Sequence, residues 1–164
     1  LIKYVFEDII RLGCKFAILG SGEKIYEDFF SEMHYRYPDR VGLTIGFVPE
    51  LSKKIYAGAD MFLMPSQSEP CGLAQMIALR YGTIPIVRET GGLRDSIHDA
   101  GDKNGNGFTF KSYNAHDMLD AVVRARAYYD DKMKWGRLVN TALKQNFSWT
   151  KSAKDYIALY NDIH

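Results

Sequence analysis

The chain has 164 residues, a length typical of one folded domain with a core of sheet and helices. Hydrophobic residues make up 46% and charged residues 25%, a balance that excludes a disordered or fibrous chain. Because 21 lysine and arginine residues face 20 aspartate and glutamate residues, no net basic field exists to attract nucleic acid or an anionic membrane. Any anion must be held by local geometry.

The cysteines and histidines predict no metal site. Cys14 and Cys71 lie far apart and form no CxxC pair, which favours a reducing cytoplasm over a disulfide framework. No apolar stretch is long enough to span a membrane, and the start does not resemble a signal peptide. The chain begins at Leu1 inside an amphipathic pattern, from which we expect a fragment of a longer polypeptide. The histidines show no metal-ligand spacing; they are His34, His98, His116 and His164.

Apolar spacing along the first half of the chain predicts alternating helices and strands. Helical stripes begin at Leu1 and again at Tyr26. A short helix is expected over residues 51–57, and strands over residues 15–19, 41–47 and 61–64. The last of these, Met61 to Met64, is too short and apolar for anything but a buried strand.

The second half continues the alternation. We expect strands over residues 84–87 and 108–110, and helices over residues 71–81, 115–129, 132–146 and 150–163. Such a pattern is typical of an α/β fold with a Rossmann-like parallel sheet covered by helices on both faces, here one domain over residues 1–164. Ligands of such sheets bind at the carboxyl ends of the strands, so the loops after Leu19, Ile45, Met64 and Val87 should share one edge.

Two of these loops could bind a phosphate. The turn Gly20-Ser21-Gly22 separates a strand from a helix, but it lacks the third glycine of the dinucleotide fingerprint, and a plain tight turn fits equally well. The loop that contains Glu69 ends in a helix whose first N–H groups, near Gly72, Leu73 and Ala74, would face an anion. Glu69 would then contact whatever the diphosphate carries, or it would only cap the helix.

Three strings around this loop identify a family. Residues 69–75 read EPCGLAQ, residues 80–85 read RYGTIP, and residues 90–95 read TGGLRD. At this spacing they resemble bacterial glycogen synthases and plant starch synthases, which are retaining glycosyltransferases of the GT-B type. Gly46-Phe47, the run 57–60 and Phe147-Ser148-Trp149 are similar to the same family. Where the wider GT-B group has a second glutamate, this sequence has Ile77, as the glycogen synthase group allows.

The resemblance implies transfer of glucose from ADP-glucose to the non-reducing end of an α-1,4-glucan, with retention and without metal or cofactor. Glu69 would be the catalytic residue, lying against the glucosyl ring. Phe47 would stack on adenine, unless it only packs in the core. The remaining nucleotide-sugar contacts would come from Cys71, Gly72, Leu73, Ala74, Gly20, Thr90 and Gly91, although Cys71 could be a buried filler and residues 90–92 only a helix start.

The sequence departs from the family at its beginning. The family's RLxxQKGLD-like segment, which supplies an arginine and a lysine to the leaving diphosphate, is not present, nor is the N-terminal domain. We therefore expect the isolated chain to be inactive and its partner to be that missing domain. The final helix, within residues 150–164, would cross to this domain in the family. Alone it would fold back on its own domain or dock on a second copy.

Two other functions stay open. One is a GT-B transferase of another specificity, such as a sucrose-synthase-like enzyme that uses UDP-glucose. The other is a noncatalytic nucleotide-binding module, for which the glycine turns and helix starts alone would suffice. Glu69 discriminates, because a pure phosphate binder has little use for a carboxylate at the mouth of an anion site.

Overall fold

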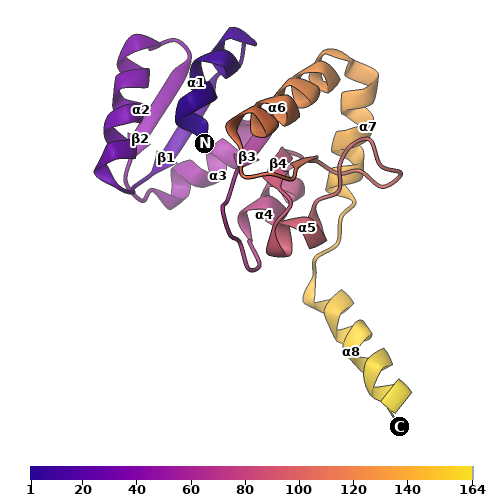
Figure 1. Ribbon diagram of the computed structural model, residues 1–164. Coiled ribbons are helices and arrows are strands. Elements are labelled where there is room, and N and C mark those ends of the chain that lie inside the picture. Colours follow the sequence, from indigo (N-terminus) through magenta and orange to yellow (C-terminus); the bar gives the residue numbers. More distant parts are fainter. Residues whose placement is uncertain (164) are drawn as a thin grey trace.

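The computed structural model describes residues 1–163, which form eight helices and five strands that alternate as far as the sixth helix (Figure 1). His164, one of the histidines considered above, lies outside the described residues. The elements are α1 (Ile2–Arg11), β1 (Phe16–Gly20), α2 (Lys24–Arg36), β2 (Val41–Ile45), α3 (Pro49–Gly58), β3 (Met61–Met64), α4 (Ala74–Tyr81), β4 (Ile84–Arg88), α5 (Gly91–Ser96), β5 (Phe108–Phe110), α6 (Ala115–Asp130), α7 (Lys132–Leu143) and α8 (Trp149–Ile163).

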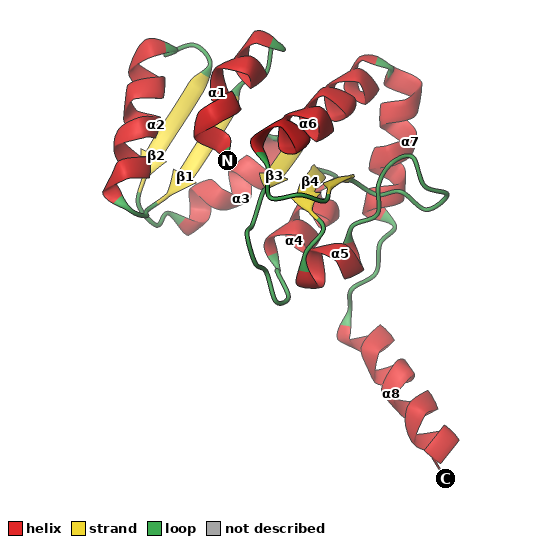
Figure 2. Cartoon of the chain, in the orientation of Figure 1, coloured by secondary structure: helices red, strands yellow, loops and turns green. Residues whose placement is uncertain are grey.

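The strands form two parallel sheets instead of the single sheet expected from the sequence (Figure 2). β1 pairs with β2, with Phe16 opposite Val41, and β4 lies between β3 and β5. Every strand pair is parallel, and helices pack against both sheets. The expected class, an α/β fold with parallel strands and covering helices, is thus confirmed, while the expectation of one continuous sheet is wrong for residues 1–163.

Helix α1 joins the half of the molecule that contains β1 and β2 to the half that contains β3, β4 and β5. It does so because its apolar residues lie on more than one face of the helix. Val5 and Ile9 belong to the main core, together with buried residues of α4, β4, β5, α6 and α7. Phe6 belongs to a smaller core with Met33 of α2 and Val41 of β2. Consecutive positions on a helix point about 100° apart, so Val5 and Phe6 serve different neighbours. α1 also packs along α6.

The division into two sheets explains why β3 is less buried than expected. All four residues of β3 are only half-buried, whereas the first four residues of β4 are buried. Within the described residues, β3 has a hydrogen-bonded neighbour on one side only, and so does β1. The expectation that Met61 to Met64 form a buried strand is therefore wrong in its burial and right in its bounds.

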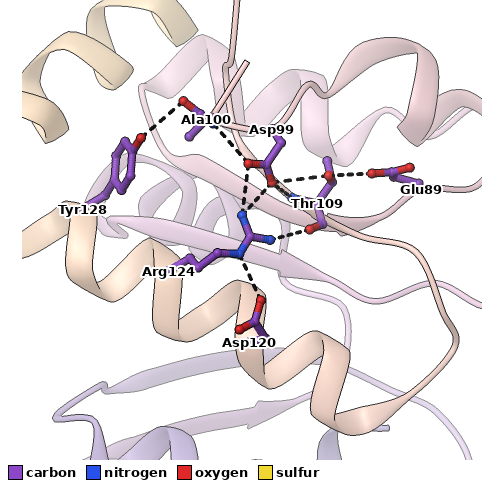
Figure 3. A network of polar contacts seen from close by, with 8 residues as sticks. Glu89, Asp99, Ala100, Thr109, Asp120, Arg124 and Tyr128 are labelled. Carbon is purple, nitrogen blue, oxygen red and sulfur yellow. Dashed lines mark hydrogen bonds and ion pairs between the residues drawn. The ribbon is translucent and has the colours of Figure 1, made fainter.

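A polar network ties β5 to α6 and to the turn before β5 (Figure 3). The guanidinium of Arg124 donates to both carboxylate oxygens of Asp99, at 3.0 and 2.8 Å, and to the carbonyl oxygen of Thr109 at 2.7 Å. It also donates to Asp120, one helical turn earlier on α6. Thr109 in turn donates from its hydroxyl to Glu89 at 2.7 Å. The network thereby fixes the end of the sheet beside β4, the strand that leads into α5.

The last helix stands away from the rest of the chain. α8 has no buried residue, and Figure 1 shows it projecting from the body after the segment that follows α7. Tyr156, Ile157 and Tyr160 are each exposed by 58% or 59%. Of the two alternatives expected for this helix, folding back on its own domain is wrong for the described residues, because none of its residues is buried.

Candidate functional site

The loop that contains Glu69 connects β3 to α4. The helix begins at Ala74, three residues later than the expected Cys71, because Gly72 has a left-handed backbone with φ of 73°. Leu73 is the N-cap residue and makes no side-chain capping bond. Among residues 1–163, the N–H groups of Gly72, Leu73 and Ala74 have no hydrogen-bond acceptor. They form the free amide cluster that the sequence predicted, and such a helix start attracts anions.

Helix α5 packs directly against this loop. The N–H of Gly92 donates to the carbonyl oxygens of Glu69 and Pro70, at 3.1 and 3.2 Å. A Cβ atom on Gly91 would lie 2.0 Å from the oxygen of Glu69, and one on Gly92 would lie 2.1 Å from the oxygen of Cys71. Thr90 is the N-cap residue of the same helix. The structure thus brings Gly91 and Gly92 to the Glu69 loop, where glycine permits the close approach of two backbones, and shows Thr90 only as the start of the helix.

Arg88, at the end of β4, holds the other side of the loop. Its guanidinium donates to the carbonyl oxygens of Gln67, at 2.6 Å, and Ser66, at 3.4 Å. Glu69 itself is half-buried, and its carboxylate makes no hydrogen bond or ion pair within residues 1–163. The alternative that Glu69 caps α4 is wrong, because the cap is Leu73. The carboxylate of Glu69 therefore has no partner within the described residues, and it lies on a loop that Arg88 and α5 hold in place.

Phe47 and Cys71 are both exposed. Phe47 follows β2 with 90% of its surface exposed, so the alternative that it packs in the core is wrong. Cys71 is also exposed, which excludes the buried-filler alternative. Phe47 belongs to the β1–β2 half and Cys71 to the other half, and the structure shows no contact between them.

The turn after β1 offers less to a phosphate than the sequence suggested. The carbonyl oxygen of Gly20 accepts from the N–H of Gly46, which links the ends of β1 and β2. The N–H of Gly22 donates to the carboxylate of Glu27 at 2.9 Å, so α2 supplies its own acceptor there. Gly20 remains at an exposed strand end on the β1–β2 half, apart from the Glu69 loop.

Two hollows of the described surface lie away from Glu69 and Phe47. One of about 200 Å³ is lined by Glu89, Arg94 and His98 with residues of the Asp99 network, and one of about 340 Å³ lies between α1 and α2. Neither is lined by Glu69 or Phe47. Within residues 1–163, no group of three or more metal-binding side chains occurs, and no helix is long and apolar enough to cross a bilayer.

Sequence reasoning missed three parts of the site. Helix α5 was predicted only as a possible helix start, and neither Arg88 nor Gln75 was singled out. The paired glycines 91 and 92 could have indicated a close backbone approach. Gln75 and Arg88 carry no such indication, since their roles depend on carbonyl groups that only the folded loop brings near them.

Comparison with known proteins defines the class. The profile of glycosyl transferases group 1 matches residues 5–137, and the chain belongs to this family. Within it, the chain is 52% identical to the glycogen synthases of Anoxybacillus flavithermus and Bacillus anthracis over 99% of its own length. It spans 34% and 35% of those two relatives. The glycogen synthase and starch synthase resemblance drawn from residues 69–95 is therefore confirmed.

Solved structures agree. The catalytic domain of starch synthase IV from Arabidopsis thaliana, bound to ADP and acarbose, superposes with a TM-score of 0.85 at 38% identity, covering 98% of this chain and 34% of that one. Anabaena HepE in complex with UDP-glucose matches with a TM-score of 0.62 at 16% identity, covering 85% of this chain and 38% of that one. At that identity the second match shows a shared fold alone.

Proposed function

We propose that this chain is the nucleotide-sugar-binding part of a glycogen or starch synthase that transfers glucose from ADP-glucose to the non-reducing end of an α-1,4-glucan. The observation that carries the proposal is the braced loop of residues 66–73. It presents a carboxylate without an internal partner, Glu69, beside three free N–H groups at the start of α4. The relatives named glycogen synthase and the starch synthase bound to ADP support the donor and the acceptor.

In this proposal the amide cluster binds the diphosphate and Glu69 acts on the sugar. Free N–H groups and the positive end of a helix stabilise an anion without a metal, and they match the charge that develops on the leaving diphosphate. The carboxylate of Glu69 would stabilise the positive charge that develops at the sugar carbon while its configuration is retained. Phe47, exposed at the end of β2, would stack on adenine once donor is bound.

The isolated chain is proposed to be inactive. A nucleotide-sugar site without a second wall would neither exclude water nor fully surround the leaving group. The chain spans about a third of its relatives. The remaining two thirds would supply the second wall, the acceptor site and the cover for α8.

A chimera tests the proposal. This chain would replace the matching third of the Anoxybacillus flavithermus glycogen synthase, and transfer of labelled glucose to a glucan primer would be measured. We expect activity with ADP-glucose well above that with UDP-glucose, and no loss on chelation with EDTA. Glu69→Gln should lower kcat by at least about a hundredfold and change ADP affinity by less than about threefold.

The outcomes separate the candidates. Preference for UDP-glucose would favour a transferase of other specificity. A folded Glu69→Gln chimera that turns over as fast as the unaltered chimera would contradict catalysis by this carboxylate. An unaltered chimera that folds and binds ADP but transfers no glucose would favour a noncatalytic binding module. Glu69→Asp is the matched control, since it keeps the charge while moving it by one methylene.

A further inference from the structure

A buried glutamine lies beneath the amide cluster. Gln75, the second residue of α4, has no exposed surface. Its side-chain Nε2 donates to the carbonyl oxygens of Cys71, at 3.2 Å, and Gly72, at 2.9 Å. The same nitrogen lies 3.1 Å from the hydroxyl of Ser96, which donates to the carbonyl oxygen of Gly92 at 2.6 Å. One amide thus links the Glu69 loop to Ser96, the last residue of α5.

The two bonds to the loop fix the direction of two peptide groups. In a planar trans peptide the carbonyl and the N–H point in opposite directions. The carbonyl of Cys71 shares its peptide with the N–H of Gly72, and the carbonyl of Gly72 shares its peptide with the N–H of Leu73. Because Gln75 draws both carbonyls into the protein, both N–H groups point out of it, where no acceptor meets them among residues 1–163.

The other end of the same amide is left without a partner. Gln75 Oε1 is buried and accepts no hydrogen bond in the described part of the chain. A buried polar atom without a partner costs free energy, so packing alone does not favour glutamine here. The position gains from the donor end of the amide, which a hydrophobic side chain of the same size lacks.

We propose that Gln75 is a positioning residue for the donor diphosphate. It holds the N–H groups of Gly72 and Leu73 outward as a preformed cradle, and Ser96 anchors it to α5. This inference rests on the proposed function, because it takes the diphosphate of a nucleotide as the anion bound at α4. Preformed amides avoid the cost of reorganising the loop when the anion arrives.

The test is an ADP titration of the ¹⁵N-labelled chain followed by NMR, with Gln75→Met as the variant and Leu79→Met as the control. Methionine matches glutamine in size but has no N–H donor. Leu79 is buried in the same helix and does not contact the loop through hydrogen bonds. We expect Gln75→Met to weaken ADP binding about tenfold, equivalent to about 1.4 kcal/mol, and Leu79→Met to change it less than twofold.

The amide signals distinguish positioning from general support of the fold. In Gln75→Met the shifts of Gly72 and Leu73 on adding ADP should be lost, while the signal of Phe47 still responds. Unchanged affinity and unchanged shifts in a folded Gln75→Met chain would overturn the role of Gln75 and leave the proposed function standing. Absence of shifts at Gly72 and Leu73 in the unaltered chain would overturn both.

Ser96→Ala serves if Gln75→Met does not fold. This change removes one anchor of the glutamine and leaves both loop carbonyls in place. The affinity for ADP should fall about threefold, because the amide is less firmly oriented. An affinity equal to that of the unaltered chain would overturn the proposal.

Discussion

At the scale of single residues, the glycines of the chain do different things once it is folded. Gly92 gives room for backbone contact, since a Cβ there would lie 2.1 Å from the carbonyl oxygen of Cys71. Gly136, in the middle of α7, has no positive φ, and a Cβ added to it would meet nothing within 4 Å. The sequence shows both simply as glycines next to helical residues.

Substituting these two glycines should therefore change stability in opposite directions. Gly92→Ala should lower the free energy of unfolding by about 1–3 kcal/mol, because the methyl group forces α5 away from the loop. Gly136→Ala should raise it by about 0.5–1 kcal/mol, as expected for a helix interior. Urea unfolding followed by circular dichroism measures both. A neutral Gly92→Ala would mean that the two backbones are not in contact.

The site residues were predictable where a motif carried them and not where folding created the contact. The spacing of residues 69–95 predicted the unpaired N–H groups before α4, which the structure confirms, while the role of Glu69 stays a prediction. The brace by Arg88 and Gln75 could not be read from the sequence, because its acceptors are backbone carbonyls whose directions depend on the loop conformation. The exposure of Phe47 could not be predicted either, since a phenylalanine at a strand end usually packs inside.

At the scale of elements, the Asp99 network makes a pH-dependent contribution to stability. Burial raises the pKa of Asp99, but hydrogen bonds from Arg124, Thr109 and Gly101 outweigh it, so the pKa of this carboxyl is lower than its ordinary value. A lowered folded-state pKa stabilises the fold above the unfolded pKa of about 3.9 and loses that contribution as the pH falls through the folded pKa.

Asp99→Asn should accordingly destabilise the chain at neutral pH and not in acid. The expected loss at pH 7 is about 1 kcal/mol, reduced from the range for buried charged hydrogen bonds because Arg124 is partly exposed. Unfolding by urea at a series of pH values should show this difference shrinking below about pH 4. Asp120→Asn, on the same arginine but 70% exposed, is the matched control and should show little change. A pH-independent loss would contradict the electrostatic account.

Helix α8 was predicted in its bounds but not in its surroundings. Apolar periodicity placed it within a residue of its observed start, and the same stripe implied a partner. No residue of α8 is buried, so its free energy of packing within this chain is close to nil. Periodicity reports that a face is apolar, and it does not report which surface covers that face.

Deleting the chain from residue 149 onward should leave the fold intact. The unfolding midpoint of the shortened chain should match that of the intact chain, because no core contact is lost. Thermal unfolding followed by circular dichroism measures this. Light scattering over a concentration series would show whether the exposed stripe causes the self-association expected above, which should then disappear in the shortened chain. Loss of the whole fold on deletion would contradict the account.

At the scale of the whole molecule, the alternation of strands and helices predicted the class correctly and the sheet incorrectly. The bounds of β3 and β5 agree with the prediction to the residue. Sequence patterns locate strands but do not pair them, so the separation of β1–β2 from β3–β4–β5 could not be foreseen. The half-buried state of β3 is a consequence of that separation.

In the proposed function, the two ends of the nucleotide site lie on different halves of the molecule. Phe47 on one half and the amide cluster on the other would have to bind the two ends of one nucleotide. The proposed function requires the diphosphate to bind at the start of α4.

A crystal structure of the chain soaked with ADP tests this claim most directly. We predict that diphosphate oxygens lie within hydrogen-bond distance of the N–H groups of Gly72, Leu73 and Ala74, with adenine stacked on Phe47. ADP bound at the turn after β1, or in the hollow lined by Glu89 and Arg94, with the α4 amides unoccupied, would contradict the account.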